Sequence, residues 1–265
     1  MIPAITSELR KFFTTRLWWG MAIAIFLAAA VFALLFGFVY TVDSGADPQL
    51  DPTFGDPTRV ANSVYTAGLG VGYLLLLTIG VMQIGSEYRH KTITSTFLAT
   101  PRRGQAMLAK VVALMVLGAI YGLISLAGSV SVGALTLITR GYDAFPSADI
   151  ARTLALSLLV LGLWALIGLG LGILIPNQVA ALIIGIGVAW IVEPLAGIVL
   201  NFWEFSREYI APYLPSQATN SIVQGVSTMP DQVQLEWWAA ALVLAAWAAL
   251  LSGIGILRTL RQDVS

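Results

Sequence analysis

Apolar residues gather along the chain in six stretches, each about as long as a helix that crosses a bilayer. A hydrocarbon core about 30 Å thick needs about 20 apolar helical residues. The stretches cover roughly residues 17–40, 62–85, 105–138, 153–175, 177–200 and 237–257. The pattern therefore predicts an all-α membrane protein with six transmembrane helices, which form a single transmembrane domain over residues 1–265.

Three details bear on where these stretches begin and end. The first apolar stretch is about twice as long as the apolar core of a signal peptide, so we expect it to be retained. The third is longer than a bilayer requires, and it either tilts or continues outside the membrane as a helix. Pro176 and Asn177 separate the fourth from the fifth, because proline has no amide with which to continue a helix.

Residues 1–16 precede the first span and are predicted to form an amphipathic helix. Their apolar positions recur at helical spacing: Ile2, Ile5, Leu9, Phe12 and Phe13. Arg10 and Lys11 lie off that stripe, as expected of an interfacial helix at a membrane surface. Two interpretations stay open: a membrane-surface anchor, and a connecting helix that also contacts a cytoplasmic partner.

Lysine and arginine are distributed unequally between the two sides of the predicted spans. Three precede the first span, five lie between the second and third, and two follow the sixth, whereas the other side carries four. Because positively charged residues favour the cytoplasmic side, we expect both termini to be cytoplasmic. An even number of spans agrees with this orientation, which is that of a multi-pass protein of the cell membrane.

Residues 86–104, SEYRHKTITSTFLATPRRG, are basic and too polar to cross a membrane. We expect residues 87–99 to form a cytoplasmic helix of about three turns, ended by Pro101. Ile93 and Phe97 share one face of that helix, with Leu98 beside them. An ordinary positively charged loop is the plainer interpretation. Such a loop needs no apolar stripe, however, so the segment is a candidate docking helix.

The polar segments on the predicted outer side differ from one another. Residues 41–59 form a loop rich in proline, aspartate and glycine, without a calcium-binding pattern. Residues 201–236 are half apolar and carry three prolines. We expect residues 203–230 to form a helical hairpin that re-enters the outer leaflet before the sixth span. Such a hairpin is possible only where its backbone is buried against protein.

Two features within the spans point to packing rather than chemistry. Glycines four residues apart predict close helix contacts: Gly68 and Gly72, Gly118 and Gly122, Gly168 and Gly172. Glu193 is the one carboxylate inside an apolar stretch. It lies about 24 Å along the helix from Asn177, near the outer edge of the membrane, so we expect an interfacial, structural role for it.

Composition narrows the possible chemistry. Charged residues make up 11% of the chain, against about 25% in a soluble domain. The formal net charge is zero, so nothing points to a nucleic-acid partner. There is no cysteine, and His90 is the one histidine, which excludes thiolate chemistry and a metal site built on histidine spacing. We expect no catalytic residues and no metal ligands.

The chain also lacks the motif with which many ATPases hold phosphate. A P-loop requires glycine directly before its lysine, and no lysine here follows a glycine. We therefore expect no cofactor bound by this chain and no enzyme activity of its own.

A local motif and the order of the elements together carry a resemblance to a known family. The motif is EYRHKTITSTFLATPRRGQAMLAK at 87–110, with its characteristic positions at Glu87, Thr92, Leu98, Pro101, Arg102, Arg103 and Lys110. It resembles the membrane subunit of ABC exporters of the type-2 permease family, in the half-size bacterial form. Gly104 departs from the pattern, since many members carry arginine there, and Arg103 is expected to substitute.

This resemblance implies a function for the complex. Two such subunits, identical or paralogous, would face each other, each paired with a P-loop ATPase that binds ATP and Mg. The helix at 87–99 would sit in a cleft of the ATPase and transmit its closure to the spans, carrying substrate out of the cell. Drugs, antibiotics, lipids and polysaccharides are carried by transporters with this layout.

The resemblance also implies roles for individual residues. The residues expected to couple the chain to the ATPase are Glu87, Arg89, Thr92, Ile93, Phe97, Leu98, Pro101 and Arg103. The substrate path, which the family builds mainly from the second and fifth spans, has the candidates Tyr73, Thr78, Gln83 and Trp190.

Other classes of membrane protein remain alternatives. A secondary transporter or channel without an ATPase would need intramembrane ionisable groups, broken helices at mid-depth or an internal repeat. A membrane enzyme would need a polar constellation, and a non-transporting scaffold would need no ATPase. A neighbouring ATPase gene would separate the first interpretation from the rest.

Overall fold

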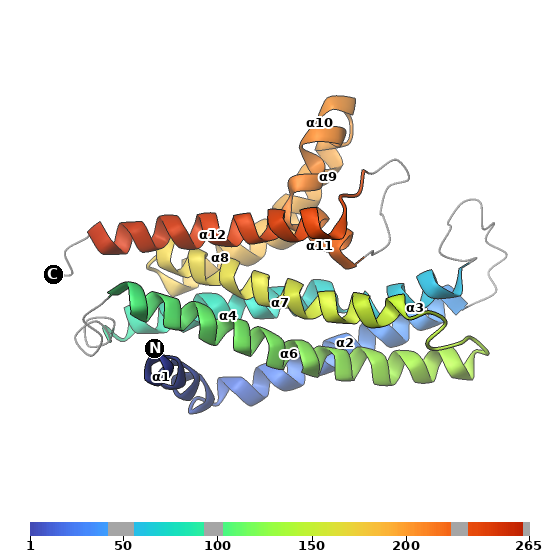
Figure 1. The fold of residues 1–265 in the computed structure, drawn as a ribbon, viewed down its shortest axis with the longest axis horizontal. Helices are drawn as coiled ribbons and strands as arrows, with labels where there is room; N and C mark the ends of the chain where they lie inside the picture. Colours follow the sequence, from blue (N-terminus) through green and yellow to red (C-terminus); the bar gives the residue numbers. More distant parts are fainter. Residues whose placement is uncertain (42–55, 93–102, 224–232, 262–265) are drawn as a thin grey trace.

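The computed structural model describes residues 1–41, 56–92, 103–223 and 233–261, and within these ranges it contains helices and no strands. Six of the helical segments are long and apolar enough to cross a membrane. The chain is thus built as a multi-pass membrane protein. The N-terminal helix, the end of the second span, the start of the third and the end of the sixth lie at one end of the bundle (Figure 1).

The observed spans follow the predicted ones closely. They are α2 (Leu17–Thr41), α3 and α4 (Pro57–Thr66 and Leu69–Arg89), α6 (Arg103–Thr139), α7 (Asp149–Leu174), the run α8, η2 and α9 (Gln178–Gly187, Val188–Val192 and Glu193–Leu200), and α12 (Trp237–Arg261). The second span begins earlier than predicted, because the Asp56 side chain accepts a hydrogen bond from the Thr58 amide and caps α3. With 37 residues, α6 is about 55 Å long and exceeds a bilayer core.

The break between the fourth and fifth spans is confirmed. Helix α7 ends at Leu174, and α8 begins at Gln178. The Asn177 side chain accepts hydrogen bonds from the amides of Val179 and Ala180, which caps the new helix.

The predicted close packing at glycines is also confirmed. A Cβ placed on Gly118 would come within 2.6 Å of the Gly162 Cα, so α6 and α7 touch backbone to backbone. A Cβ on Gly168 would collide with the carbonyl of Leu77, which places α7 equally close to α4. Lipid chains are as apolar as the helices, so helix association in a membrane depends on van der Waals packing. Larger residues at these glycines would prevent that packing.

The N-terminal amphipathic helix is present as α1 (Ile2–Phe13). It packs on α6 through Phe12, whose ring meets that of Tyr121 edge-on at 5.9 Å. Ile2 and Phe13, at the ends of the predicted apolar stripe, are exposed, whereas Glu8 in the middle of the helix is buried. The packed face is therefore rotated toward Glu8.

Two predicted segments differ in detail. Residues 87–89 form the last turn of α4 rather than the start of a separate helix, and Lys91 adopts a left-handed φ of 55° beyond it. Residues 93–99 lie outside the described part of the chain. Within the predicted hairpin, α10 (Glu204–Tyr209) projects with α9 from the bundle, and α11 (Pro215–Val223) packs back on α12 (Figure 1).

Candidate functional site

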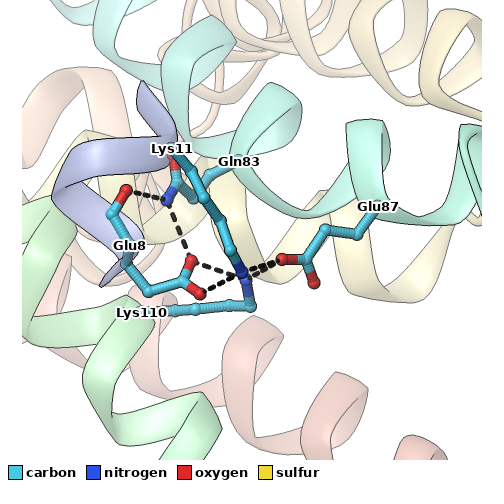
Figure 2. Close-up of polar contacts among 5 residues, drawn as sticks. All are labelled: Glu8, Lys11, Gln83, Glu87 and Lys110. Carbon is cyan, nitrogen blue, oxygen red and sulfur yellow. Dashed lines mark hydrogen bonds and ion pairs between the residues drawn. The ribbon is translucent and has the colours of Figure 1, made fainter. Parts of the chain in front are cut away.

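Four charged side chains from three helices meet at the end of the bundle that carries α1 (Figure 2). Glu8 and Lys11 come from α1, Glu87 from the last turn of α4 and Lys110 from the second turn of α6. Gln83, one turn before Glu87, completes the group. We refer to these five residues as the charge cluster.

Each ammonium group of the charge cluster bridges both carboxylates. The Lys110 Nζ lies 2.7 Å from Glu8 Oε2 and 2.9 Å from Glu87 Oε1. The Lys11 Nζ lies 2.7 Å from Glu8 Oε1 and 2.7 Å from Glu87 Oε1. The Gln83 Nε2 donates to Glu8 Oε2 at 3.1 Å. The two positive and two negative charges form a neutral, closed arrangement that joins all three helices.

Because the charge cluster is buried, the pairing of its charges affects the stability of the bundle. The Lys110 side chain is 0% exposed, those of Glu8 and Glu87 are buried, and Lys11 is 44% exposed. An isolated ion in such a place would cost several kcal/mol in desolvation, which close pairing and hydrogen bonds offset. Removing or separating one partner leaves the others uncompensated, so the charge cluster holds α1, α4 and α6 in one relative position.

The charges on α1 are stabilised by their surroundings. Burial by itself would raise the pKa of Glu8, but the ammonium groups of Lys110 and Lys11 outweigh it and hold that pKa below its usual value. Burial would lower the pKa of Lys11, but the carboxylates of Glu8 and Glu87 outweigh it and raise that pKa. Both groups are therefore charged at neutral pH.

The predicted coupling residues fall into two groups. Glu87 belongs to the charge cluster and is buried, whereas Arg89 and Thr92 are exposed beyond it. Ile93, Phe97, Leu98 and Pro101 lie outside the described residues, and of Arg103 the structure describes the backbone, as the first residue of α6. Helix α4 therefore ends, and α6 begins, near the charge cluster.

The four candidates for a substrate path lie in different surroundings. Tyr73 lines a cavity, and the Thr78 hydroxyl donates to the Leu74 carbonyl of its own helix. Gln83 belongs to the charge cluster. Trp190, on the π-helical turn η2, is 60% exposed on the outside of the bundle. Their part in a substrate path stays a prediction.

Sequence reasoning missed Glu8 and Lys110 as a pair. One signal was present: Glu8 falls between Ile5 and Leu9 on the apolar face of its helix, and Lys110 lies inside the third apolar stretch. A charge on an apolar face and another within a span indicate a buried pair. Their separation of 102 residues hides which partner each one has.

Glu193 is buried against α11, and its interfacial, structural role stays a prediction. It is 8% exposed, and its Oε2 accepts a hydrogen bond from the Ser216 amide at 2.8 Å. The carboxylate thereby satisfies a free amide in the first turn of α11. Across the described ranges, no group of three or more histidine, aspartate or glutamate residues is arranged to hold a metal ion.

The chain matches no protein-family model and no curated protein.

Proposed function

We propose that this chain is the transmembrane permease subunit of an ATP-binding cassette exporter. In this role it moves a substrate out of the cell, with a separate P-loop ATPase binding ATP and Mg. The observation that carries the proposal is the charge cluster, which locks the end of α4, the start of α6 and α1 together around the connection that bears the family-like motif.

The charge cluster suits the transmission of force. A partner that pushes on residues 87–99 would displace the end of α4, and Lys110 and Lys11 would carry α6 and α1 with it. Because separating buried ions is costly, the three helices would move as one body. ATP-driven closure of the partner then biases the bundle between two states, which is how ligand binding at one place drives a conformational change at another.

The coupling residues would have different roles. Arg89, Thr92 and Arg103 would make polar contacts with the ATPase, and Ile93, Phe97 and Leu98 would form the packed knob. Glu87 would act as an internal strut, because its carboxylate is buried against two lysines. A second permease copy or a paralogue would complete the transporter in the cell membrane.

A pull-down of the tagged chain in mild detergent, with mass spectrometry, tests the proposal. We expect a stoichiometric ATPase with a Walker A motif, and its loss in the variant Phe97→Asp/Leu98→Asp. The matched control is Ser95→Asp/Ala99→Asp, which adds the same charge away from the Ile93 and Phe97 stripe. Absence of an ATPase from a host with the native operon, or equal yields from both variants, would overturn the proposal.

A secondary transporter without an ATPase is the second candidate. One observation favours it: η2 interrupts the fifth span as a π-helical turn, and the buried Glu193 follows directly. Transport in ATPase-free proteoliposomes driven by a proton gradient, and abolished by Glu193→Gln, would support this candidate over the exporter.

A further inference from the structure

A cavity of about 320 Å³ lies between α2, the α3–α4 span and α11, away from the charge cluster. Phe36 and Tyr40 of α2 form one wall, and Tyr73 of α4 forms another. Ser63, Thr66 and Asn220 contribute polar groups. No lysine, arginine, aspartate or glutamate in the described part of the chain lines it.

The walls of the cavity are fixed by contacts behind them. The Tyr73 ring stacks on Trp164 with centroids 4.2 Å apart and planes 15° apart. The Trp164 Nε1 donates to Thr219 Oγ1 at 2.9 Å, which attaches α11 to α7. The Glu193 carboxylate holds the Ser216 amide at the start of α11. The cavity is therefore preformed, and a ligand would meet little ordering cost on entry.

Two polar groups of the lining have spare hydrogen-bonding capacity. Ser63 is 6% exposed, and the structure gives its hydroxyl no hydrogen bond among the described residues. The half-buried side-chain amide of Asn220 likewise has no hydrogen bond among the described residues. Both side chains can therefore pair with an occupant that donates and accepts hydrogen bonds.

We infer that this cavity is a binding site for a neutral small molecule with an aromatic ring and a hydroxyl group, which can both donate and accept a hydrogen bond. The aromatic wall suits the ring, and Ser63 and Asn220 suit the polar group. The absence of charge in the lining disfavours an ion, since burying one unpaired is costly. A lipid acyl chain would leave both polar side chains without partners. The volume is at the lower end of ligand pockets, about 300–1,000 Å³.

Gly70 offers a way to close the site without disturbing the fold. It lines the cavity, and the nearest atom to a Cβ placed there is Tyr73 Cε1, at 4.0 Å. Gly70→Leu should therefore fill the cavity. The matched control is Gly187→Leu on α8, where nothing lies within 4 Å of the added Cβ. Both changes replace a helical glycine with the same side chain, so their general effects on helix propensity are alike.

The test uses the full chain in phosphatidylcholine nanodiscs and the photoreactive probe 4-(hydroxymethyl)benzophenone, which is neutral and aromatic and carries one hydroxyl. We expect saturable adducts within residues 63–73 and 216–223 in the wild type and in Gly187→Leu, and their loss in Gly70→Leu. The analogue 4-methylbenzophenone, which lacks the hydroxyl, should compete poorly. This comparison needs no variant, so it holds even if Gly70→Leu misfolds.

Any of three results would overturn the inference. The adducts could fail to saturate, they could spread over the lipid-facing helices equally in all three proteins, or the methyl analogue could suppress them equally well. The site stands on the geometry of this chain and requires no ATPase. A failed pull-down with intact labelling would refute the exporter alone, and a captured ATPase without labelling would refute the cavity site alone.

Discussion

Lys110 places its ammonium group between two carboxylates, on a side chain that is 0% exposed. Each lies within 2.9 Å of its ammonium nitrogen. Glu8 also receives a hydrogen bond from Gln83, so the charge cluster is satisfied by more than pairing alone. At the scale of single residues, the stability of this end of the bundle depends on charge balance.

We expect Lys110→Met to destabilise the protein by about 3–5 kcal/mol, because it leaves two buried carboxylates to share the single charge of Lys11. Tryptophan fluorescence during thermal unfolding in detergent measures the change. Lys91→Met is the control, since Lys91 is exposed. Equal melting temperatures for the two variants would show that the charge cluster does not hold the bundle together.

Acid should weaken the bundle through Glu8. Its folded pKa lies below the unfolded value of 4.5, so the unfolded state binds more protons as the pH falls, and stability is lost below about pH 4.5. The raised pKa of Lys11 acts in the opposite direction, and its contribution is lost above about pH 10.5. As the pH is lowered from 7 to 3.5, the melting temperature should fall less steeply for Glu8→Gln than for the wild type. Parallel curves would contradict this.

At the scale of elements, the centre of the bundle is the close pairing of α7 with α4 and α6. Glycine at 118, 162 and 168 lets backbones touch, and Trp164 between them stacks on Tyr73. The same helix holds α11 through Thr219, so one helix supports both the interior and the cavity wall. Larger residues at these glycines would force the helices apart.

Gly168→Val tests this packing. The added Cβ would come within 2.8 Å of the Leu77 carbonyl carbon, which is backbone and cannot move aside cheaply. We expect a loss of stability of about 1–3 kcal/mol, the usual range for overpacking. Gly187→Val serves as the control, because open space surrounds that position. A loss as large in the control would mean that β-branching in a helix, and not the contact, is responsible.

At the scale of the whole molecule, α4 joins two places of different character. Tyr73 lines the cavity and Gln83 belongs to the charge cluster, ten residues or about 15 Å apart along one helix. Movement of the charge cluster would therefore reach the cavity through a rigid element. This arrangement would supply a physical route from the proposed ATPase to a ligand in the cavity, with α4 as the element both sites would bias.

The orientation of the chain is testable because it contains no cysteine. In intact cells, Asp47→Cys should react with a membrane-impermeant maleimide from outside, and Ser95→Cys should react only after the cells are opened. The expectation follows from the excess of lysine and arginine around residue 95. The reverse pattern would place both termini outside and remove the basis for a cytoplasmic ATPase.

Sequence alone determined the spans, the N-terminal helix and the break at Pro176, because bilayer thickness, helical period and proline geometry act on neighbouring residues. It also indicated where α4 and α6 pack closely on α7, since small residues leave a local mark. It placed the start of the segment at 87–99 wrongly, because α4 continues to Arg89 before Lys91 turns the chain.

Tertiary structure decided which charges meet and which helices enclose space. Lys11 and Glu87 are 76 residues apart and Lys110 and Glu8 are 102 apart, so no local pattern pairs them. The cavity likewise needs α2, α4 and α11 to converge. Such contacts arise from the packing of the whole bundle, where the cost of burying a charge or leaving a gap depends on partners that only the folded chain supplies.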